Sequence, residues 1–166
     1  MRNILSIVIL IFLSDNLLAQ QTIAKDSALF DFWVGEWDAS WTNEDGTRGA
    51  AHNSIKKILD GKVIQESFVD PQGFKGTSIS VYNPQRKTWH QAWADNQGGY
   101  FNFLGEVDGN KRIFRTPTRE VGGKAVTQRM IFYDITGSSM TWDWEISNDG
   151  GKTWKLQWRI NYTRKQ

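Results

Sequence analysis

The sequence predicts an all-β protein: a ten-stranded antiparallel up-and-down β-barrel, closed at one end by a short N-terminal helical plug. Three observations predict this fold. The chain of 166 residues is 13% aromatic, with nine tryptophans and 15 glycines, a composition that favours strands. Apolar and polar residues alternate in short runs. Nearly every gap between runs carries Gly with Asp, Asn or Pro, which tolerate hairpin turn angles.

The N-terminus has the features of a secretory signal peptide. Arg2 supplies a positive start, residues 4–13 are almost continuously apolar, and Leu17-Leu18-Ala19 offers a cleavage site before Gln20. The apolar run of about ten residues is too short to span a bilayer, which needs about twenty. We therefore expect a signal peptide over residues 1–19, a periplasmic or secreted protein, and a single barrel domain over residues 20–166.

The predicted plug is one aromatic helical turn, Phe30 to Trp33, that runs into the first strand at Gly35. Glycine permits a sharp turn there, and Trp37 then fills the barrel floor. The strands are expected at residues 36–42, 47–58, 62–69, 74–82, 88–96, 100–107, 111–119, 124–135, 139–147 and 153–164. Ten antiparallel strands linked by hairpins are expected to close into a barrel, because closure pairs the backbone groups of the two edge strands and so removes the sheet edges.

Alternation predicts which residues face inward. The last strand places Trp154, Leu156, Trp158, Ile160 and Tyr162 on one face, and its partner places Trp142, Trp144 and Ile146 together. The opposite charged faces would meet outside in pairs such as Glu145 with Arg159.

Polar residues on an inner face would indicate a cavity. If Trp89 and Trp93 face inward, then Gln91 and Asp95 do too, and they need partners or water. Two strands stay open at this point. Residues 62–69 place either Gln65 or Glu66 inside, and residues 124–135 place either Arg129 or Met130 inside.

Several motifs together resemble a known family. They are Phe32-Trp33-Val34-Gly35-Glu36-Trp37, Leu59-Asp60-Gly61-Lys62-Val63-Ile64-Gln65-Glu66, Val81-Tyr82-Asn83-Pro84, Trp89-His90-Gln91-Ala92-Trp93-Ala94-Asp95-Asn96 and Lys155-Leu156-Gln157-Trp158-Arg159. This set resembles the bacterial domain of unknown function 1579 family, which is similar to the lipocalin-like (calycin) superfamily. The resemblance implies an exported calycin-type barrel, and it carries no activity or catalytic residue with it.

The predicted ligand-binding residues are the aromatic and polar residues of the expected inner faces. The aromatic rings would stack on a flat or apolar ligand, and the alternative is that they only fill the core. Arg129 would pair with a ligand carboxylate beside Glu66 and Asp95, unless these three are exposed strand charges. The full set is Trp41, Gln65, Glu66, Trp89, Gln91, Trp93, Asp95, Arg129, Trp142, Trp144 and Trp158.

Composition argues against several other functions. The chain has no cysteine, so thiolate metal sites and cysteine nucleophiles are excluded, and its net charge of +2 gives no reason to expect a nucleic acid partner. The two histidines, His52 and His90, show no metal-ligand spacing, and no histidine late in the chain offers a haem ligand, leaving only Tyr133 or Tyr162. Ser78 and Ser80 lie mid-strand without a Gly-x-Ser-x-Gly motif. No cofactor or metal is predicted.

The stretch Ser147-Asn148-Asp149-Gly150-Gly151-Lys152-Thr153-Trp154 resembles the Asp-box of sialidase propellers. There the motif is a hairpin turn held by side-chain-to-backbone hydrogen bonds, and a single copy without propeller repeats predicts a turn.

Three functions remain open. The first is an exported barrel that binds one small apolar or amphipathic molecule. The second is an enzyme on the same barrel that uses Glu66 or Asp95 as acid or base, with His90 nearby. The third is a packed barrel that acts through its surface on a protein partner.

Overall fold

The structure, a computed structural model, describes residues 20–165, so the predicted signal peptide lies outside the described residues. Residues 20–27 are helical and a 3-10 turn, η1 (Asp31–Trp33), precedes the first strand. The strands are β1 (Gly35–Thr42), β2 (Arg48–Ile58), β3 (Val63–Val69), β4 (Lys75–Asn83), β5 (Thr88–Asp95), β6 (Tyr100–Asp108), β7 (Lys111–Arg115), β8 (Arg119–Val121), β9 (Lys124–Tyr133), β10 (Ser139–Ser147) and β11 (Lys155–Arg164). Within residues 20–165, no helix has both the length and the apolar character that a membrane crossing requires.

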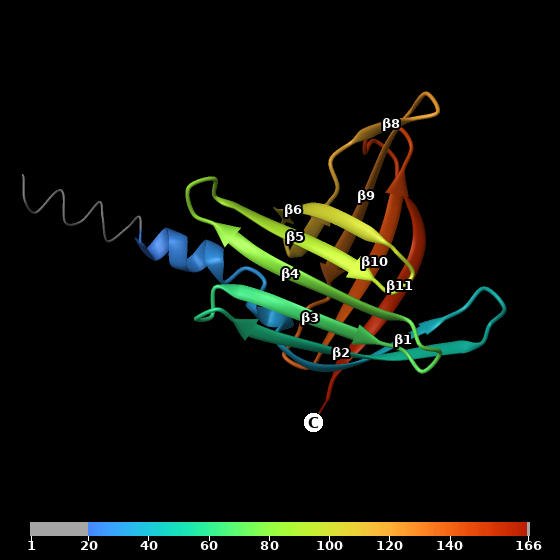
Figure 1. Ribbon diagram of the computed structural model, residues 1–166, viewed down its shortest axis with the longest axis horizontal. Helices are drawn as coiled ribbons and strands as arrows, with labels where there is room; N and C mark the ends of the chain where they lie inside the picture. The colour runs from blue at the N-terminus through green and yellow to red at the C-terminus, as the bar shows by residue number, and fades with distance from the viewer. Residues whose placement is uncertain (1–19, 166) are drawn as a thin grey trace, which may run out of the picture.

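Ten of these strands form a closed antiparallel barrel (Figure 1). Each strand from β1 to β6 pairs with the strand that follows it, β7 pairs with β9, and β9, β10 and β11 continue the wall. Pairing of β11 with β1 then closes it. The predicted fold class is confirmed.

One predicted strand, residues 111–119, is wrong because the chain breaks within it. Strand β7 ends at Arg115, and β8 starts at Arg119 and pairs with the first residues of β9 as an extension beyond the barrel wall. Pro117 lies in the break, where its ring fixes the backbone and removes the hydrogen-bond donor that a central strand needs.

The structure resolves the two strands whose orientation the sequence left open, β3 by burial and β9 by which residue lines the cavity. In β3, Glu66 is 6% exposed and faces inward between Ile64 and Phe68, whereas Gln65 is exposed on the outside. In β9, Met130 faces inward and Arg129 outward. The predicted inner set of β5, with Gln91 and Asp95 beside the tryptophans, is confirmed.

A β-bulge overturns one prediction about the last hairpin, the inward direction of Leu156. The register shifts between Trp144 and Glu145, so that Trp144 lies opposite Trp158 but Glu145 lies opposite Leu156. The extra residue in β11 reverses the alternation. Leu156 therefore faces outward, 42% exposed, rather than inward with Trp158.

The same register gives different ion pairs on the outer face. Arg159 lies opposite Asp143 and binds it through two bonds of 2.7 Å, Nε to Oδ1 and Nη2 to Oδ2. The predicted pair of Glu145 with Arg159 is thus wrong, because Glu145 accepts a 2.7 Å bond from Arg129 Nε instead.

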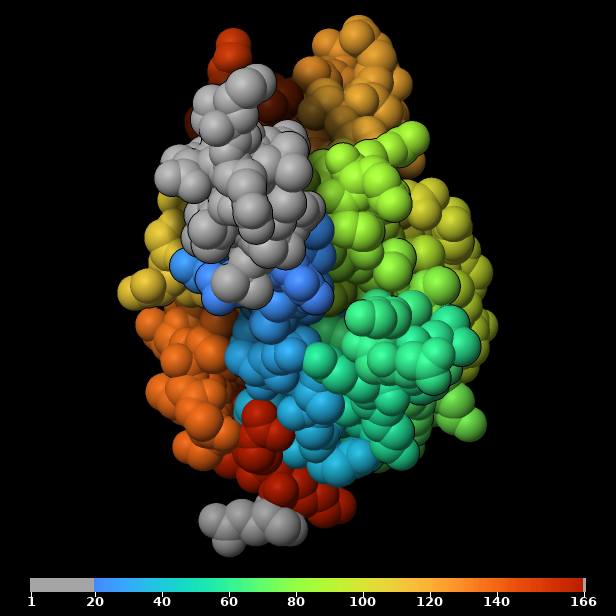
Figure 2. Space-filling model, turned by 90° about the vertical axis from the view of Figure 1, so that its left-hand side faces the viewer, coloured from blue at the N-terminus to red at the C-terminus, as the bar shows by residue number. Residues whose placement is uncertain are grey.

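The N-terminal segment plugs one end of the barrel, and Figure 2 shows it in blue lying across that end. Phe30 is 1% exposed, stacks on Phe114 with ring centroids 4.3 Å apart, and meets Trp89 edge-on at 5.1 Å. Trp37 donates from Nε1 to the Trp33 carbonyl at 2.7 Å. The predicted plug thus lies where the sequence placed it.

Arg164 of β11 links the plug to the barrel through hydrogen bonds. Its Nη1 donates to the Val34 carbonyl at 2.8 Å and its Nη2 to the Phe32 carbonyl at 3.1 Å. The guanidinium also lies 4.2 Å from the centre of the Trp37 ring, a cation–π contact. A side chain at Gly35, whose φ is +142°, would collide with this guanidinium, which explains the glycine.

Candidate functional site

The barrel contains a partly open cavity of about 180 Å³ between the plug and the opposite end. Ten of its fourteen lining residues are aromatic, and a cavity of about 150 Å³ is already enough to accept a benzene ring. The aromatic members are Trp33, Phe68, Phe74, Trp93, Phe101, Phe103, Trp142, Trp144, Trp158 and Tyr162. The other four are Glu66, Asp95, Met130 and Ile160. This is the shape of a small-ligand site with a few polar groups in an apolar wall.

Glu66 is the polar centre of the cavity wall. Asn53 Nδ2 donates to its Oε1 at 2.8 Å, and Ser78 Oγ donates to its Oε2 at 2.6 Å. Behind Ser78, Gln91 Nε2 donates to Ser78 Oγ at 3.3 Å and to Ser80 Oγ at 3.0 Å. Neighbouring strands β2 to β5 supply these groups, which fix the carboxyl in place.

Burial governs the acid–base properties of this centre. Desolvation raises the pKa of Glu66 to about 7, against the lowering effect of the bonds from Ser78 and Asn53. Burial also raises the pKa of Tyr162, and the nearby Glu66 charge adds to the shift, so the phenol stays neutral. Near neutral pH, Glu66 therefore exchanges between its charged and uncharged forms.

Two residues of the cavity wall carry a polar hydrogen that no acceptor among residues 20–165 receives. Trp33 is 2% exposed, lines the cavity, and its Nε1 has no hydrogen-bond partner among residues 20–165. The Tyr162 hydroxyl accepts a 3.4 Å bond from Asn53 Nδ2, which leaves its own proton for another acceptor. A buried donor without a partner carries a free-energy penalty, so a ligand that accepts from it gains affinity.

Asp95 lies on the cavity wall at the end of β5, away from the plug. Partial burial would raise its pKa, but bonds from the Gly99 amide at 2.8 Å, Trp93 Nε1 at 3.1 Å and the Gln97 amide at 3.0 Å lower it overall. Asp95 is therefore ionised at neutral pH.

The structure brings six of the predicted ligand-binding residues together on the cavity wall: Glu66, Trp93, Asp95, Trp142, Trp144 and Trp158. Three other predicted residues face inward but do not line the cavity; they contact residues of the cavity wall, of the plug or behind Glu66. Trp41 packs edge-on to Trp158 at 5.0 Å, Trp89 donates to the Asp26 carbonyl under the plug, and Gln91 bonds the two serines behind Glu66.

The other two predicted residues, Gln65 and Arg129, face the outside. A one-residue step along a strand reverses the direction of the side chain, so Gln65 points away where Glu66 points in. Arg129 was predicted to join Glu66 and Asp95, but the inward position beside it belongs to Met130. Arg129 therefore does not lie on the cavity wall, where the predicted pairing with a ligand carboxylate would need it.

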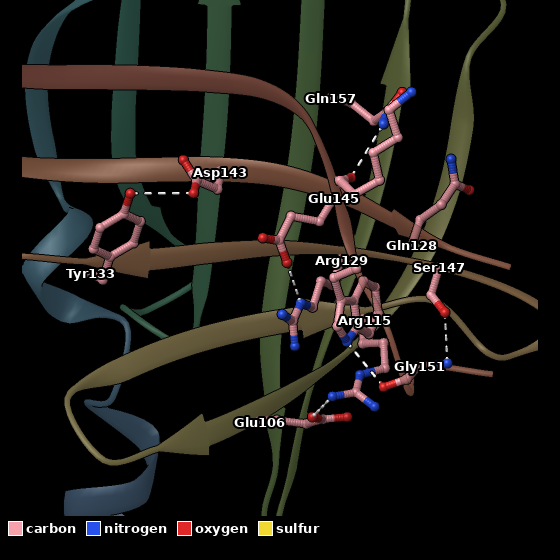
Figure 3. Close-up of polar contacts among 12 residues, drawn as sticks. Glu106, Arg115, Gln128, Arg129, Tyr133, Asp143, Glu145, Ser147, Gly151 and Gln157 are labelled. Carbon is pink, nitrogen blue, oxygen red and sulfur yellow. Dashed lines mark hydrogen bonds and ion pairs between the residues drawn. The ribbon is translucent and has the colours of Figure 1, made fainter. Parts of the chain in front are cut away.

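Arg129 belongs to an outer cluster, which Figure 3 shows in close-up. It pairs with Glu145, and its guanidinium carbon lies 3.8 Å from the centre of the Trp154 ring. Arg115 pairs with Glu106 at 3.0 Å. Each arginine thus has a carboxylate of its own, and the cluster stabilises the wall from outside.

Sequence reasoning missed Asn53, Trp33 and Tyr162 as site residues. Asn53 is 0% exposed on a strand whose inner face is otherwise apolar, between Ala51 and Ile55. A polar residue at such a position was the available signal, because burying an amide requires a buried partner.

The histidines lie outside the cavity. His52 Nε2 bonds Glu36 Oε2 at 2.9 Å on the outer face, and His90 lies beside the exposed residues Val81 and Leu104. His90 is therefore not near Glu66 and Asp95, contrary to the prediction. In the described chain, no three His, Cys, Asp or Glu side chains are grouped as metal ligands.

The Asp-box stretch forms the predicted turn. Asp149 accepts from the Lys152 and Thr153 amides and from Thr153 Oγ1 at 2.6 Å, while Ser147 Oγ accepts from the Gly151 amide at 2.8 Å. Ser147 Oγ also donates to Asp149 Oδ1 at 2.6 Å. This bond, together with those from Thr153 and Lys152, holds the pKa of Asp149 well below its usual range. The motif orders the β10–β11 hairpin.

Comparison with known proteins supports the fold. The chain is similar to the crystal structure of Rv2717c from M. tuberculosis, with a TM-score of 0.54 and 13% sequence identity over 85% of this chain and 98% of that chain. No family model and no curated protein matches the sequence. At this identity the likeness concerns the barrel fold.

Proposed function

We propose that this protein is an exported barrel that binds one small apolar or amphipathic molecule in its aromatic cavity. The observation that carries the proposal is the cavity itself, about 180 Å³ of space walled mainly by aromatic rings around the buried carboxyl of Glu66. Packed protein interiors contain few voids larger than a water molecule. A packed barrel that acts only through its surface would have no reason to keep one of this size.

The hydrogen-bond donor of Trp33 that has no partner supports a ligand-binding role for the aromatic residues rather than a role in filling the core. Trp33 lines the cavity and its buried Nε1 has no partner among the described residues, and the Tyr162 hydroxyl has a proton to give. Such groups fix the orientation of a ligand in an otherwise apolar pocket. Export is supported by the apolar run after Arg2, and membership of the lipocalin-like family by the motifs around Trp37 and Trp93.

The proposal is tested by native mass spectrometry of protein purified without denaturation. We expect a reproducible extra mass that is lost on denaturation. Phe101→Trp, which enlarges a side chain on the cavity wall, should reduce the bound fraction, whereas Tyr100→Trp, at a neighbouring position that is 63% exposed, should retain it. A clean apo mass for the unmodified protein, with no quenching of tryptophan fluorescence by small aromatic compounds, would exclude the binding function.

A second candidate is an enzyme in which Glu66 acts as acid or base. Its buried carboxyl titrates at about 7, which suits proton transfer at neutral pH. This hypothesis predicts that the molecule recovered from the barrel is converted by fresh protein, and that Glu66→Gln abolishes the conversion while still binding the molecule. Return of the molecule unchanged after prolonged incubation would leave binding as the function.

A further inference from the structure

The carboxyl groups on the cavity wall have no basic side chain beside them on that wall. Its two ionisable acids are Glu66 and Asp95, and no Lys, Arg or His lines it in the part of the chain that the structure describes. Arg115 of β7 and Arg129 of β9 point outward, each paired with a glutamate. A ligand carboxylate would meet two acids and no counter-ion, which is unfavourable in a medium of low polarity.

The aromatic rings of the cavity wall also favour a cation over an anion. The π faces of Trp, Tyr and Phe carry partial negative charge, and an organic cation held against them is stabilised, most strongly when water is excluded. The tryptophans Trp93, Trp142, Trp144 and Trp158 all contribute to this wall. Aromatic cages with a nearby carboxylate are suited to ammonium groups on apolar bodies.

Glu66 is able to pair with such a group without losing its present bonds. Each of its oxygens receives one internal bond, from Asn53 or Ser78, and a carboxylate oxygen has a second acceptor position. The other titratable group beside it is Tyr162 from β11, which stays neutral, while Asn53 from β2 and Ser78 from β4 carry no charge. Asp95 adds a second negative charge farther from the plug.

We propose that the cavity recognises an organic cation, an ammonium group carried on a small aromatic or apolar body, with Glu66 as its counter-ion. This inference rests on the proposed binding function and names its ligand class. The raised pKa of Glu66 fits it, because a buried carboxylate without a counter-ion is costly and a bound cation removes that cost. Binding then releases the Glu66 proton, so cation affinity rises with pH through about 7.

The test compares three probes that share a phenyl ring: phenyltrimethylammonium, the neutral tert-butylbenzene of nearly the same shape, and benzoate. Affinity is measured on the unmodified protein by quenching of tryptophan fluorescence. We expect the ammonium compound to bind at least about tenfold more tightly than tert-butylbenzene at about pH 8.5, and benzoate most weakly. Since phenyltrimethylammonium does not titrate, a decline in its affinity toward about pH 5.5 reports protonation of Glu66.

Variants identify the counter-ion. Glu66→Gln should remove most of the ammonium preference and its pH dependence, while leaving tert-butylbenzene affinity within about twofold. Glu106→Gln, an acid on the outer face paired with Arg115, is the matched control and should change neither. Circular dichroism verifies that each variant is folded.

The outcomes separate the two proposals. If tert-butylbenzene or benzoate binds as tightly as the ammonium compound at high pH, the cation inference is overturned and small-molecule binding stands. If no probe binds and native mass spectrometry also gives a clean apo mass, both proposals fail.

Discussion

The stability of the ligand-free barrel should depend on the protonation of Glu66. Its pKa is about 7 in the folded protein, against an ordinary value of 4.5 that represents the unfolded chain. Because the folded value is the higher one, folding favours the protonated form. The contribution of Glu66 protonation to the free energy of unfolding is fully present below pH 4.5 and is lost as the pH rises through about 7.

The size of this loss follows from the shift. One pKa unit corresponds to about 1.4 kcal/mol, so the free energy of unfolding should fall by about 3 kcal/mol between the two limits. Glu66→Gln keeps the shape of the protonated acid and removes its charge. The glutamine amide nitrogen is able to donate to Ser78 Oγ, and its oxygen is able to accept from Asn53 Nδ2.

Urea unfolding at pH values from about 5 to about 8.5 measures the effect. Glu66→Gln should be close to the unmodified protein in stability at the acid end and more stable by up to about 3 kcal/mol at the alkaline end. All other side chains are the same in the two proteins, so their contributions cancel in the difference. Parallel pH profiles would refute the reasoning, since Glu66 would then titrate at the same pH in the folded and unfolded chains.

Three further predictions concern the wall and the plug. Arg164→Lys should lower the free energy of unfolding by about 2 kcal/mol in urea titrations, because an ammonium cannot bond several carbonyls and cover Trp37 at once; no change would mean that the plug is held by its apolar contacts alone. Asp143→Asn should lower it by about 1–2 kcal/mol, since Asp143 is buried while its partner Arg159 is half exposed, and loss of the effect in the Arg159→Met background verifies the pairing. Asp149→Ala should accelerate hydrogen exchange in the β10–β11 turn, and unchanged exchange would contradict the role of that carboxylate.

Most of the barrel was predictable because hairpin strands carry local signals. Alternation and the turns between strands located every barrel strand, although the one at residues 111–115 was predicted to run on to residue 119, and Gly35 with Trp37 identified the plug. The errors arose where a single residue changes the register. The bulge beside Trp144 is an insertion that alternation cannot reveal, and it turned Leu156 outward. The pair of Glu145 with Arg159 was wrong because Arg159 lies opposite Asp143, two residues earlier in β10.

The orientation of β9 could not be read from sequence because both its faces are buried. Met130 lies in the cavity wall, while Ile131, on the opposite face, is only 5% exposed beneath the outer ion pairs. Strands that are apolar on both sides lack the alternation that distinguishes inside from outside. The position of Arg129, and with it the charge of the candidate site, therefore required the three-dimensional structure.

The most direct test of a ligand site inside this barrel is methionine-methyl NMR during titration with the three phenyl probes. Met130 lines the cavity, whereas Met140 is 2% exposed in the core, so the two methyl groups report on the cavity and on the packed interior. Leucine substitutions assign the two signals. We expect at least one probe to shift the Met130 signal in a saturable manner and to leave Met140 nearly unchanged. A Met130 signal that is insensitive to all three probes would contradict a ligand site in the cavity.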